Sequence, residues 1–370
     1  MVCRHEAHSF SFNKSSNIFM KGNNKKLVRH KKNVHVYSEK HRFLLNIIGM
    51  YSNIFFAICI LSSDIKLGKA NIFEWDYGHH HQFQENWIGI CKKGKRQSPI
   101  DLKTEYANKM RLAAHPLLFN GYDKQAAAQV KNNGHTVKVT FSNGPHDDIW
   151  VKDYGISVSR YEFSQAHFHW GDNDHHGSEH TINGKAFPME MHLVHWNREA
   201  GNTFQEAVNK STGTSLEVLG ILFKIGKTNK NFKNLFDAIK HVQKHNQTAN
   251  IKQGIRLNDL LPSDRDALYR YKGSLTTPMI RNEGCYEIVM WTIFKEKIEI
   301  DEKQMNIMRR LTYDHKGNEE SMFNNYRKVQ LENGRDILDF DVEQSTARMS
   351  SSITLQAVIM FVSLVKMSLH

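Results

Sequence analysis

The sequence predicts an α+β protein that is mainly β, a single domain built around one large, twisted and mostly antiparallel sheet with peripheral helices. Four short runs rich in β-branched and apolar residues predict strands: 137–141, 148–152, 217–225 and 287–294. In 231–245, apolar residues recur at helical spacing and predict a surface helix packed on the sheet. Strands outnumber helices and do not alternate regularly with them, which argues against a parallel α/β sheet.

The amino end is a basic leader. Residues 1–42 hold ten Lys or Arg against two acidic residues, so this stretch carries +8 of the formal net charge of +12. It is polar, rich in Asn and Lys and without periodicity, which predicts disorder. Because the excess charge is confined to this tail and no nucleic-acid-binding motif is present, we expect a solvated segment and no nucleic-acid partner.

An apolar segment follows at 43–63, uncharged over the length that a membrane helix needs. It is either a signal anchor or, if translation begins at Met50 rather than Met1, a secretory signal that is cleaved. Asn46 and Asn53 weaken a spanning helix and favour the cleaved signal. Both interpretations place the rest of the chain outside the cell or at its surface, by way of the secretory pathway.

Residues 71–342 have the composition of a globular domain, and 343–370 form a Ser-rich and then apolar tail. Small residues before a short hydrophobic carboxyl end fit a glycolipid-anchor (GPI) signal, and a disordered or membrane-dipping tail is the alternative. The triplets that begin at Asn209 and Asn246 are glycosylation acceptors, consistent with export. We therefore expect a terminal membrane anchor as an option, while the oligomeric state stays open.

Two histidine-bearing runs predict a metal site. In an extended strand Gln165, His167 and His169 share one face, while the bulky Phe168 and Trp170 take the opposite face and suit a core. The run 190–194 repeats this pattern: Glu190, His192 and Val194 share a face, and Met191 and Leu193 take the reverse. If the two strands pair antiparallel, three imidazoles converge on one point. Three neutral histidines with a fourth position open are typical of a catalytic zinc site.

Two polar residues on the same faces strengthen the zinc interpretation. A metal-bound histidine usually donates its other ring N–H to an acceptor that fixes its tautomer and orientation. Gln165 lies two residues before one candidate ligand, and Glu190 lies two residues before another. Without a metal, burying these polar side chains on a strand face would cost free energy for no evident reason.

Four stretches carry a family resemblance. They are Lys-Arg-Gln-Ser-Pro-Ile-Asp at 95–101, Gln-Ala-His-Phe-His-Trp-Gly at 165–171, Ser-Glu-His-Thr-Ile through Phe187 to Glu-Met-His-Leu-Val at 178–194, and Tyr-Lys-Gly-Ser-Leu-Thr-Thr-Pro at 271–278. From about Phe73 to Phe340 the chain resembles α-class carbonic anhydrases, most of all the exported or membrane-anchored ones. The resemblance implies a zinc lyase that reversibly hydrates carbon dioxide to bicarbonate and a proton.

The resemblance also implies individual roles. His167, His169 and His192 would hold Zn²⁺, which makes bound water a hydroxide nucleophile near neutral pH, as in carbonic anhydrases generally. Thr276 matches the threonine that orients this hydroxide, and Glu179 matches the carboxylate that accepts the threonine proton.

Further matches concern the proton and the substrate. His135 matches the histidine that shuttles the proton out, and Tyr77 and Asn133 match residues that order the relay waters. The matches to the carbon dioxide pocket are Val194, Val218, Leu275, Thr277 and Trp291, although its apolar members are equally explained as core.

Cys91 and Cys285 fall where exported members of the family carry a disulfide, which would tether the segment that holds Thr276. Two positions depart from the family pattern: Lys272 stands where proline is usual, and Lys138 stands where a neutral polar residue is usual at the pocket mouth. The strongest alternative to an enzyme is a binding module of the same fold that has lost activity. Ester hydrolysis is a third possibility for the same zinc chemistry.

Overall fold

The computed structural model describes Trp75, Tyr77, Gln84, Asn86 and residues 87–341, apart from 111–115, 143–147, 154–158, 211–212, 279–283 and 316–317. The predicted leader 1–42, the apolar segment 43–63 and the tail 343–370 lie outside these residues. Among the helices that are described, none has both the length and the apolar character to cross a bilayer.

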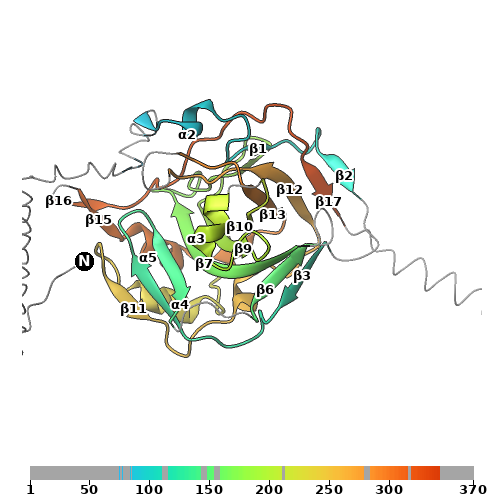
Figure 1. The fold of residues 1–370 in the computed structure, drawn as a ribbon. Helices are drawn as coiled ribbons and strands as arrows, with labels where there is room; N and C mark the ends of the chain where they lie inside the picture. The colour runs from blue at the N-terminus through green and yellow to red at the C-terminus, as the bar shows by residue number, and fades with distance from the viewer. Residues whose placement is uncertain are drawn as a thin grey trace, which may run out of the picture. The chain divides into compact units, whose positions relative to one another are not determined.

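One 13-stranded sheet dominates the fold (Figure 1). Its main path runs β11-β4-β5-β7-β9-β10-β13-β12-β17-β2, while β14 pairs with β10, β6 with β7, and β3 with β6. The strands are β2 (Asn108–Met110), β3 (Leu117–Asn120), β4 (Ala128–Asn132), β5 (Val137–Phe141), β6 (Trp150–Asp153), β7 (Arg160–Trp170), β9 (Met189–Asn197), β10 (Leu216–Ile225), β11 (Thr248–Asn250), β12 (Leu268–Gly273), β13 (Val289–Phe294), β14 (Ile298–Ile300) and β17 (Leu338–Phe340).

The predicted α+β, mainly β class is confirmed, and the sheet is mixed. Most neighbouring strands are antiparallel, as expected, but β10 runs parallel to β13 and β14, and β17 runs parallel to β2. Two small sheets accompany it: β1 (Asp101–Leu102) with β8 (Thr181–Ile182), and β15 (Thr312–His315) with β16 (Asn318–Ser321).

The described helices are short and peripheral. They are α2 (Ile90–Lys93), α3 (Phe204–Lys210), α4 (Lys233–Ile239), the 3-10 turn η2 (Leu257–Leu260) and α5 (Glu302–Arg309). A capping box starts α5, because the Asp301 carboxylate accepts from the Gln304 N–H and the Gln304 side chain accepts from the Asp301 N–H.

The helix expected over 231–245 is shorter than its apolar pattern suggests. Its periodic residues Phe232, Leu235, Phe236, Ile239 and Val242 are all buried, as predicted, but the α-helix ends at Ile239. The Asn132 side chain of β4 donates to the carbonyl oxygens of Val242 and Gln243, both at 3.2 Å. The segment after Ile239 therefore meets the sheet through this amide and makes tight turns instead of another helical turn.

The central strands are covered on both faces. All nine residues of β9 are buried. Phe168, Trp170, Met191 and Leu193 lie in one hydrophobic cluster, as their alternation predicts. Val194, together with residues of β10 and β13, lies in a second cluster on the histidine side. Of the polar side chains on this second side, His169, Glu190 and His192 are buried, whereas Gln165 and His167 are half-buried.

Candidate metal centre

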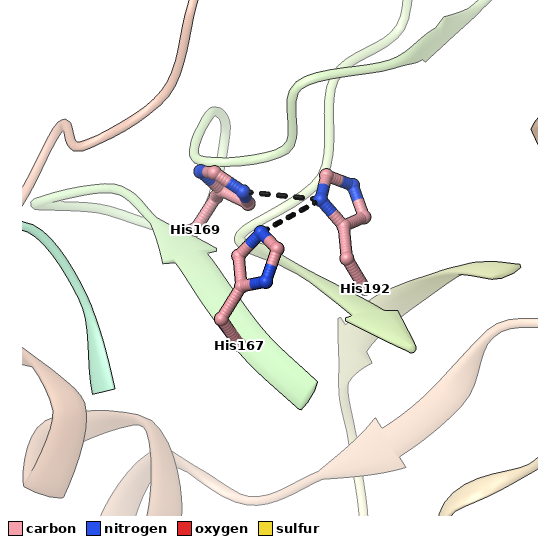
Figure 2. Close-up of side chains that lie close together, drawn as sticks. All are labelled: His167, His169 and His192. Atoms are coloured by element: carbon pink, nitrogen blue, oxygen red, sulfur yellow. Dashed lines mark hydrogen bonds between the residues drawn. The ribbon is translucent and has the colours of Figure 1, made fainter. Parts of the chain in front are cut away.

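The register of two strands brings three imidazoles together. In the antiparallel pair β7 and β9, His167 lies directly opposite His192, and His169 lies opposite Glu190. His192 Nδ1 is 3.2 Å from His167 Nε2 and 3.1 Å from His169 Nε2 (Figure 2). One nitrogen from each ring can be chosen so that all three nitrogens lie within 4.8 Å of one another. The three residues can therefore share one metal ion.

Each ring has an acceptor behind it. His167 Nδ1 lies 3.0 Å from Gln165 Oε1, and His192 Nε2 lies 2.7 Å from Glu190 Oε1, the two acceptors expected from the sequence. His169 Nδ1 lies 2.8 Å from the backbone oxygen of Asn325. Because an oxygen acceptor places the ring proton on the nitrogen facing it, the three converging nitrogens carry lone pairs. His192 Nδ1 lies 3.1–3.2 Å from the other two nitrogens, so their lone pairs repel one another. A cation bound between the three nitrogens would remove this repulsion.

The electrostatics favour neutral rings. Burial first, and then the neighbouring His192 and His169, hold the pKa of His167 well below its ordinary value. Burial also lowers the pKa of His169. Glu190 is the reverse case: burial alone would raise its pKa, but His180 and His192 outweigh it and hold this pKa well below the usual range. The lowered pKa values of His167 and His169 favour neutral imidazoles, and that of Glu190 favours an ionised carboxylate, the states that zinc ligands and their supports require.

Glu190 is fully bonded within the protein. Its Oε2 accepts from the backbone N–H groups of Glu179 and His180 at 2.9 and 2.7 Å, and its Oε1 contacts His180 Nδ1 and His192 Nε2, both at 2.7 Å. His180, Glu190 and His192 also satisfy the spacing of a metal cluster. Since their atoms already bond one another, and His180 Nε2 contacts the Tyr271 hydroxyl at 2.7 Å, we interpret this group as the support of the first cluster.

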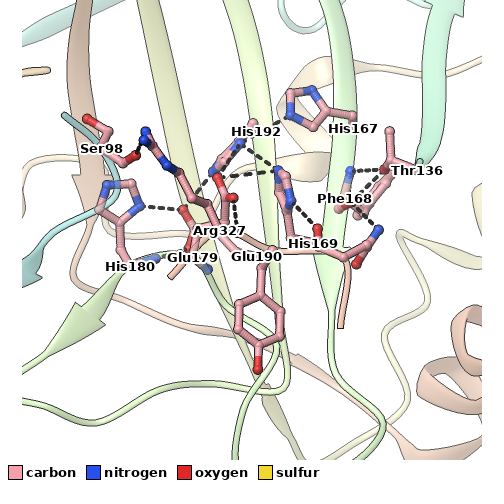
Figure 3. A network of polar contacts seen from close by, with 12 residues as sticks. Ser98, Thr136, His167, Phe168, His169, Glu179, His180, Glu190, His192 and Arg327 are labelled. Atoms are coloured by element: carbon pink, nitrogen blue, oxygen red, sulfur yellow. Dashed lines mark hydrogen bonds and ion pairs between the residues drawn. The ribbon is translucent and has the colours of Figure 1, made fainter. Parts of the chain in front are cut away.

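Glu179 lies beside the imidazoles with one free oxygen (Figure 3). Its Oε1 accepts from the Arg327 N–H at 2.8 Å. Its Oε2 has no hydrogen-bond partner among the described residues, so the bond expected from the Thr276 hydroxyl is not formed in this structure. That oxygen instead faces His169 Nε2 at 3.6 Å and His192 Nδ1 at 4.0 Å. A buried carboxylate oxygen facing histidine nitrogens is a second feature that suits a nearby cation.

The residues predicted to line the substrate pocket fall into two groups. Val218 pairs with Val194 on one side and with Trp291 on the other, so these three buried residues follow one line across β9, β10 and β13. The Trp291 ring lies 4.8 Å from the His192 ring, which places apolar surface against the histidine cluster. Leu275 and Thr277 are half-buried in the segment after β12, next to the buried Thr276.

Two of the residues predicted for the proton relay, Asn133 and His135, lie in the loop between β4 and β5. The His135 ring stacks on Trp75 with centroids 4.1 Å apart, and it is partly exposed. Asn133 Oδ1 accepts from the backbone N–H groups of His135 and Thr136, so its oxygen shapes this loop. The buried Tyr77 ring meets the His169 ring edge-on at 6.5 Å.

The expected disulfide is present between Cys91 and Cys285. It joins α2 to the segment whose Tyr286 oxygen accepts from the Leu275 N–H at 2.9 Å. Leu275 precedes Thr276, so the disulfide anchors the stretch that carries this threonine.

Sequence reasoning missed two supports. Arg327 donates its backbone N–H to Glu179 and its guanidinium to Gln97 Oε1, the Ser98 oxygen and the Cys91 oxygen at 2.7–2.9 Å. Asn325 supplies the acceptor for His169 through its backbone, and any residue type has a backbone oxygen. No signal in the sequence identified either, because both follow from where the chain returns after β16.

Comparison with known proteins identifies the family. Residues 80–340 match the family described as eukaryotic-type carbonic anhydrase, and the chain belongs to that family. It is 37% identical over 243 residues to carbonic anhydrase 12 of Homo sapiens, covering 64% of each chain. It is 35% identical over 239 residues to carbonic anhydrase 4 of Rattus norvegicus, covering 64% of this chain and 72% of that protein.

A further relative, putative carbonic anhydrase 5 of Caenorhabditis elegans, is 32% identical over 299 residues, covering 80% of this chain and 91% of that protein. The chain thus spans about two thirds of the human relative's length and most of the nematode one.

Proposed function

We propose that this protein is a zinc-dependent carbonic anhydrase that reversibly hydrates carbon dioxide to bicarbonate and a proton. The convergence of three imidazole lone pairs, each ring oriented by an oxygen acceptor, carries the proposal. His167, His169 and His192 would hold the ion. When bound there, zinc supplies a Lewis acid that brings the pKa of its water close to 7, as in carbonic anhydrases generally.

The protein's own residues would orient the reactants. An ionised carboxylate can only accept, so Glu179 Oε2, with its lone pairs unengaged, is available to the Thr276 hydroxyl proton. The Thr276 oxygen is then left as an acceptor that turns a nucleophile towards carbon dioxide. Val194, Val218 and Trp291 offer an apolar surface that suits this uncharged molecule, and Leu275 and Thr277 would complete the pocket.

Proton removal would pass through His135. A partly exposed imidazole on a loop between two strands can exchange protons with solvent, and histidine is the residue type best suited to a relay through water near neutral pH. Tyr77 and Asn133 would hold the relay waters. The buried cluster and the exposed loop together would give the proton a path from the centre to the outside.

We further propose an extracellular or cell-surface location. The Cys91–Cys285 disulfide supports this, because such bonds persist in oxidising compartments. Mass spectrometry of the mature termini would decide between a lipid anchor, a signal anchor and a free secreted form.

Zinc content and stopped-flow carbon dioxide hydration test the proposed activity. His192→Ala should abolish both zinc retention and hydration, because it removes one of three ligands. His195→Ala is the matched control: it lies on the same strand and is equally buried, but it contacts Tyr122 on the other face. Wild-type protein that folds yet binds no zinc and hydrates no carbon dioxide would instead support a binding module of this fold.

A further inference from the structure

A row of facing residues connects the histidine cluster to one edge of the sheet. His192 of β9 lies opposite His167 of β7, and His167 lies opposite Lys138 of β5. Lys138 in turn lies opposite Lys131 of β4, and Lys131 lies opposite Thr248 of the edge strand β11. Residues directly opposite each other share one face of a sheet, so both lysines are on the side of the histidines.

The alternation of buried and exposed residues agrees with this placement. Val137 and Val139, the neighbours of Lys138 in β5, are buried in the hydrophobic cluster on the other side of the sheet. Along the row, exposure falls from the two exposed lysines to the half-buried His167 and the buried His192. The row therefore leads from solvent to the candidate metal centre.

The two lysines carry positive charge that no described residue compensates. Neither Lys131 nor Lys138 forms an ion pair or hydrogen bond with a residue that the structure describes. The remaining side chains on this face of β11, β4 and β5 are uncharged: Thr248, Asn250, Gln129 and Thr140. Like charges directly opposite each other destabilise a sheet, so packing does not explain this pair.

The lysine charges act along the row. Partial burial first, and then the charge of Lys131, lower the pKa of Lys138. After burial and the two neighbouring histidines, the charge of Lys138 also contributes to the lowered pKa of His167. An anion above Lys138 would relieve the repulsion between the lysines, and it would lie next to the first imidazole of the cluster.

We propose that Lys131 and Lys138 draw small oxyanions of the bicarbonate type along this face to the histidine cluster. The proposal rests on the function proposed above, in which bicarbonate is the charged reactant. A surface lined by one sign of charge raises the local concentration of ions of the opposite sign. A lysine ammonium is a hydrated point charge on a flexible stem, so it attracts an anion without fixing its orientation. Both lysines would thus act without touching the reacting atoms.

Paramagnetic relaxation by soluble nitroxides tests this proposal. A nitroxide that bears a carboxylate is the oxyanion probe, and its uncharged carboxamide analogue is the reference. The relaxation of the backbone amide protons of Thr140 and His167 is compared for the two probes in the full chain as purified. Lys131→Gln and Lys138→Gln are measured beside Lys109→Gln, which removes an exposed lysine from β2 at the other end of the sheet.

We expect the anionic probe to relax these protons about threefold more than the neutral probe. This excess should fall by about half in Lys138→Gln, fall less at His167 in Lys131→Gln, stay unchanged in Lys109→Gln, and disappear in about 1 M sodium chloride. The urea midpoint of Lys138→Gln should not fall, because the substitution removes a repulsion.

Equal relaxation by the two probes would overturn the proposal, as would an excess that survives both substitutions on the row. An equal loss in Lys109→Gln would also overturn it, because the effect would then come from net charge alone. The measurement requires neither bound zinc nor hydration activity, so a failure here is distinguishable from a failure of the proposed function.

Discussion

Replacing Glu190 by glutamine tests whether this carboxylate holds the metal centre together. Its two oxygens accept four hydrogen bonds, two from backbone N–H groups and two from the rings of His180 and His192. Glutamine keeps the shape but turns one of the acceptor atoms into a donor. If the amide nitrogen takes the Oε2 position, it faces two backbone N–H donors, at about 1–3 kcal/mol each. If it takes the Oε1 position, the rings of His180 and His192 must change tautomer to accept from it, which puts the His192 proton on the nitrogen that faces the other two histidines. We expect Glu190→Gln to lower the free energy of unfolding by about 2–6 kcal/mol.

Zinc affinity should fall as well, because the acceptor behind His192 fixes which nitrogen carries the proton. Losses of roughly 10- to 100-fold follow removal of such partners in metalloenzymes, carbonic anhydrases included. Urea unfolding of metal-free protein measures the first effect, and competition with a chromophoric chelator measures the second. Glu217→Gln is the matched control, since Glu217 is equally buried but bonds Arg270 and Thr292. If Glu190→Gln kept wild-type stability and zinc affinity, our account of the centre would be wrong.

Three further expectations concern the relay, the disulfide and a buried acid. His135→Ala should keep zinc while carbon dioxide hydration slows by about 100-fold in weak buffer, and imidazole buffers should restore the rate; without such rescue His135 is not the relay. Replacing Cys91 and Cys285 by serine should cost about 2–5 kcal/mol in urea unfolding, since the bond closes a loop with a sequence separation of 194, and an unchanged midpoint would contradict this. Burial raises the pKa of Glu217 from 4.5 to about 7 against the opposing effect of Arg270, so the folded state holds a proton that the unfolded chain releases. Stability should therefore fall by about 3 kcal/mol as the pH rises from 4.5 to about 7, and a pH scan of Glu217→Gln should lack this slope.

The strand faces could be predicted from the sequence where alternation is uninterrupted. Between Gln165 and Trp170 the apolar side chains point into the core and the histidines point away, as period-two patterning requires. The pattern changes at a β-bulge between Phe163 and Gln165. Because of this extra residue, Phe163 and Phe168 both lie in the same core cluster, although simple alternation would put them on opposite faces. A bulge leaves no mark in composition, so sequence reasoning did not find it.

Contacts between segments that are distant in the sequence could not be predicted from it. Gln165 and Glu190 each lie two residues before the histidine that they support, so the spacing within each strand predicted these two pairs. Asn325 and Arg327 reach the centre from more than 130 residues beyond His192, one through a backbone oxygen and the other through a backbone N–H. Such groups carry no residue-specific signal. The end of α4 was misjudged for a similar reason, since it depends on the amide of Asn132 in a separate strand.

These distant contacts also explain how the disulfide bears on the metal centre. Arg327 donates to the Cys91 oxygen with its guanidinium and to Glu179 with its backbone N–H. Cys285, the other half of the bond, accepts from Gln97, whose own oxygen accepts from Arg327. A change at Cys91 therefore reaches Glu179 through Arg327, and a change at Cys285 reaches it through Gln97 and then Arg327. Loss of the bond should loosen the carboxylate that faces His169 before it affects His167 and His192, because those two histidines are held by strand register and by acceptors in their own strands, whereas His169 also depends on the Asn325 oxygen of this segment.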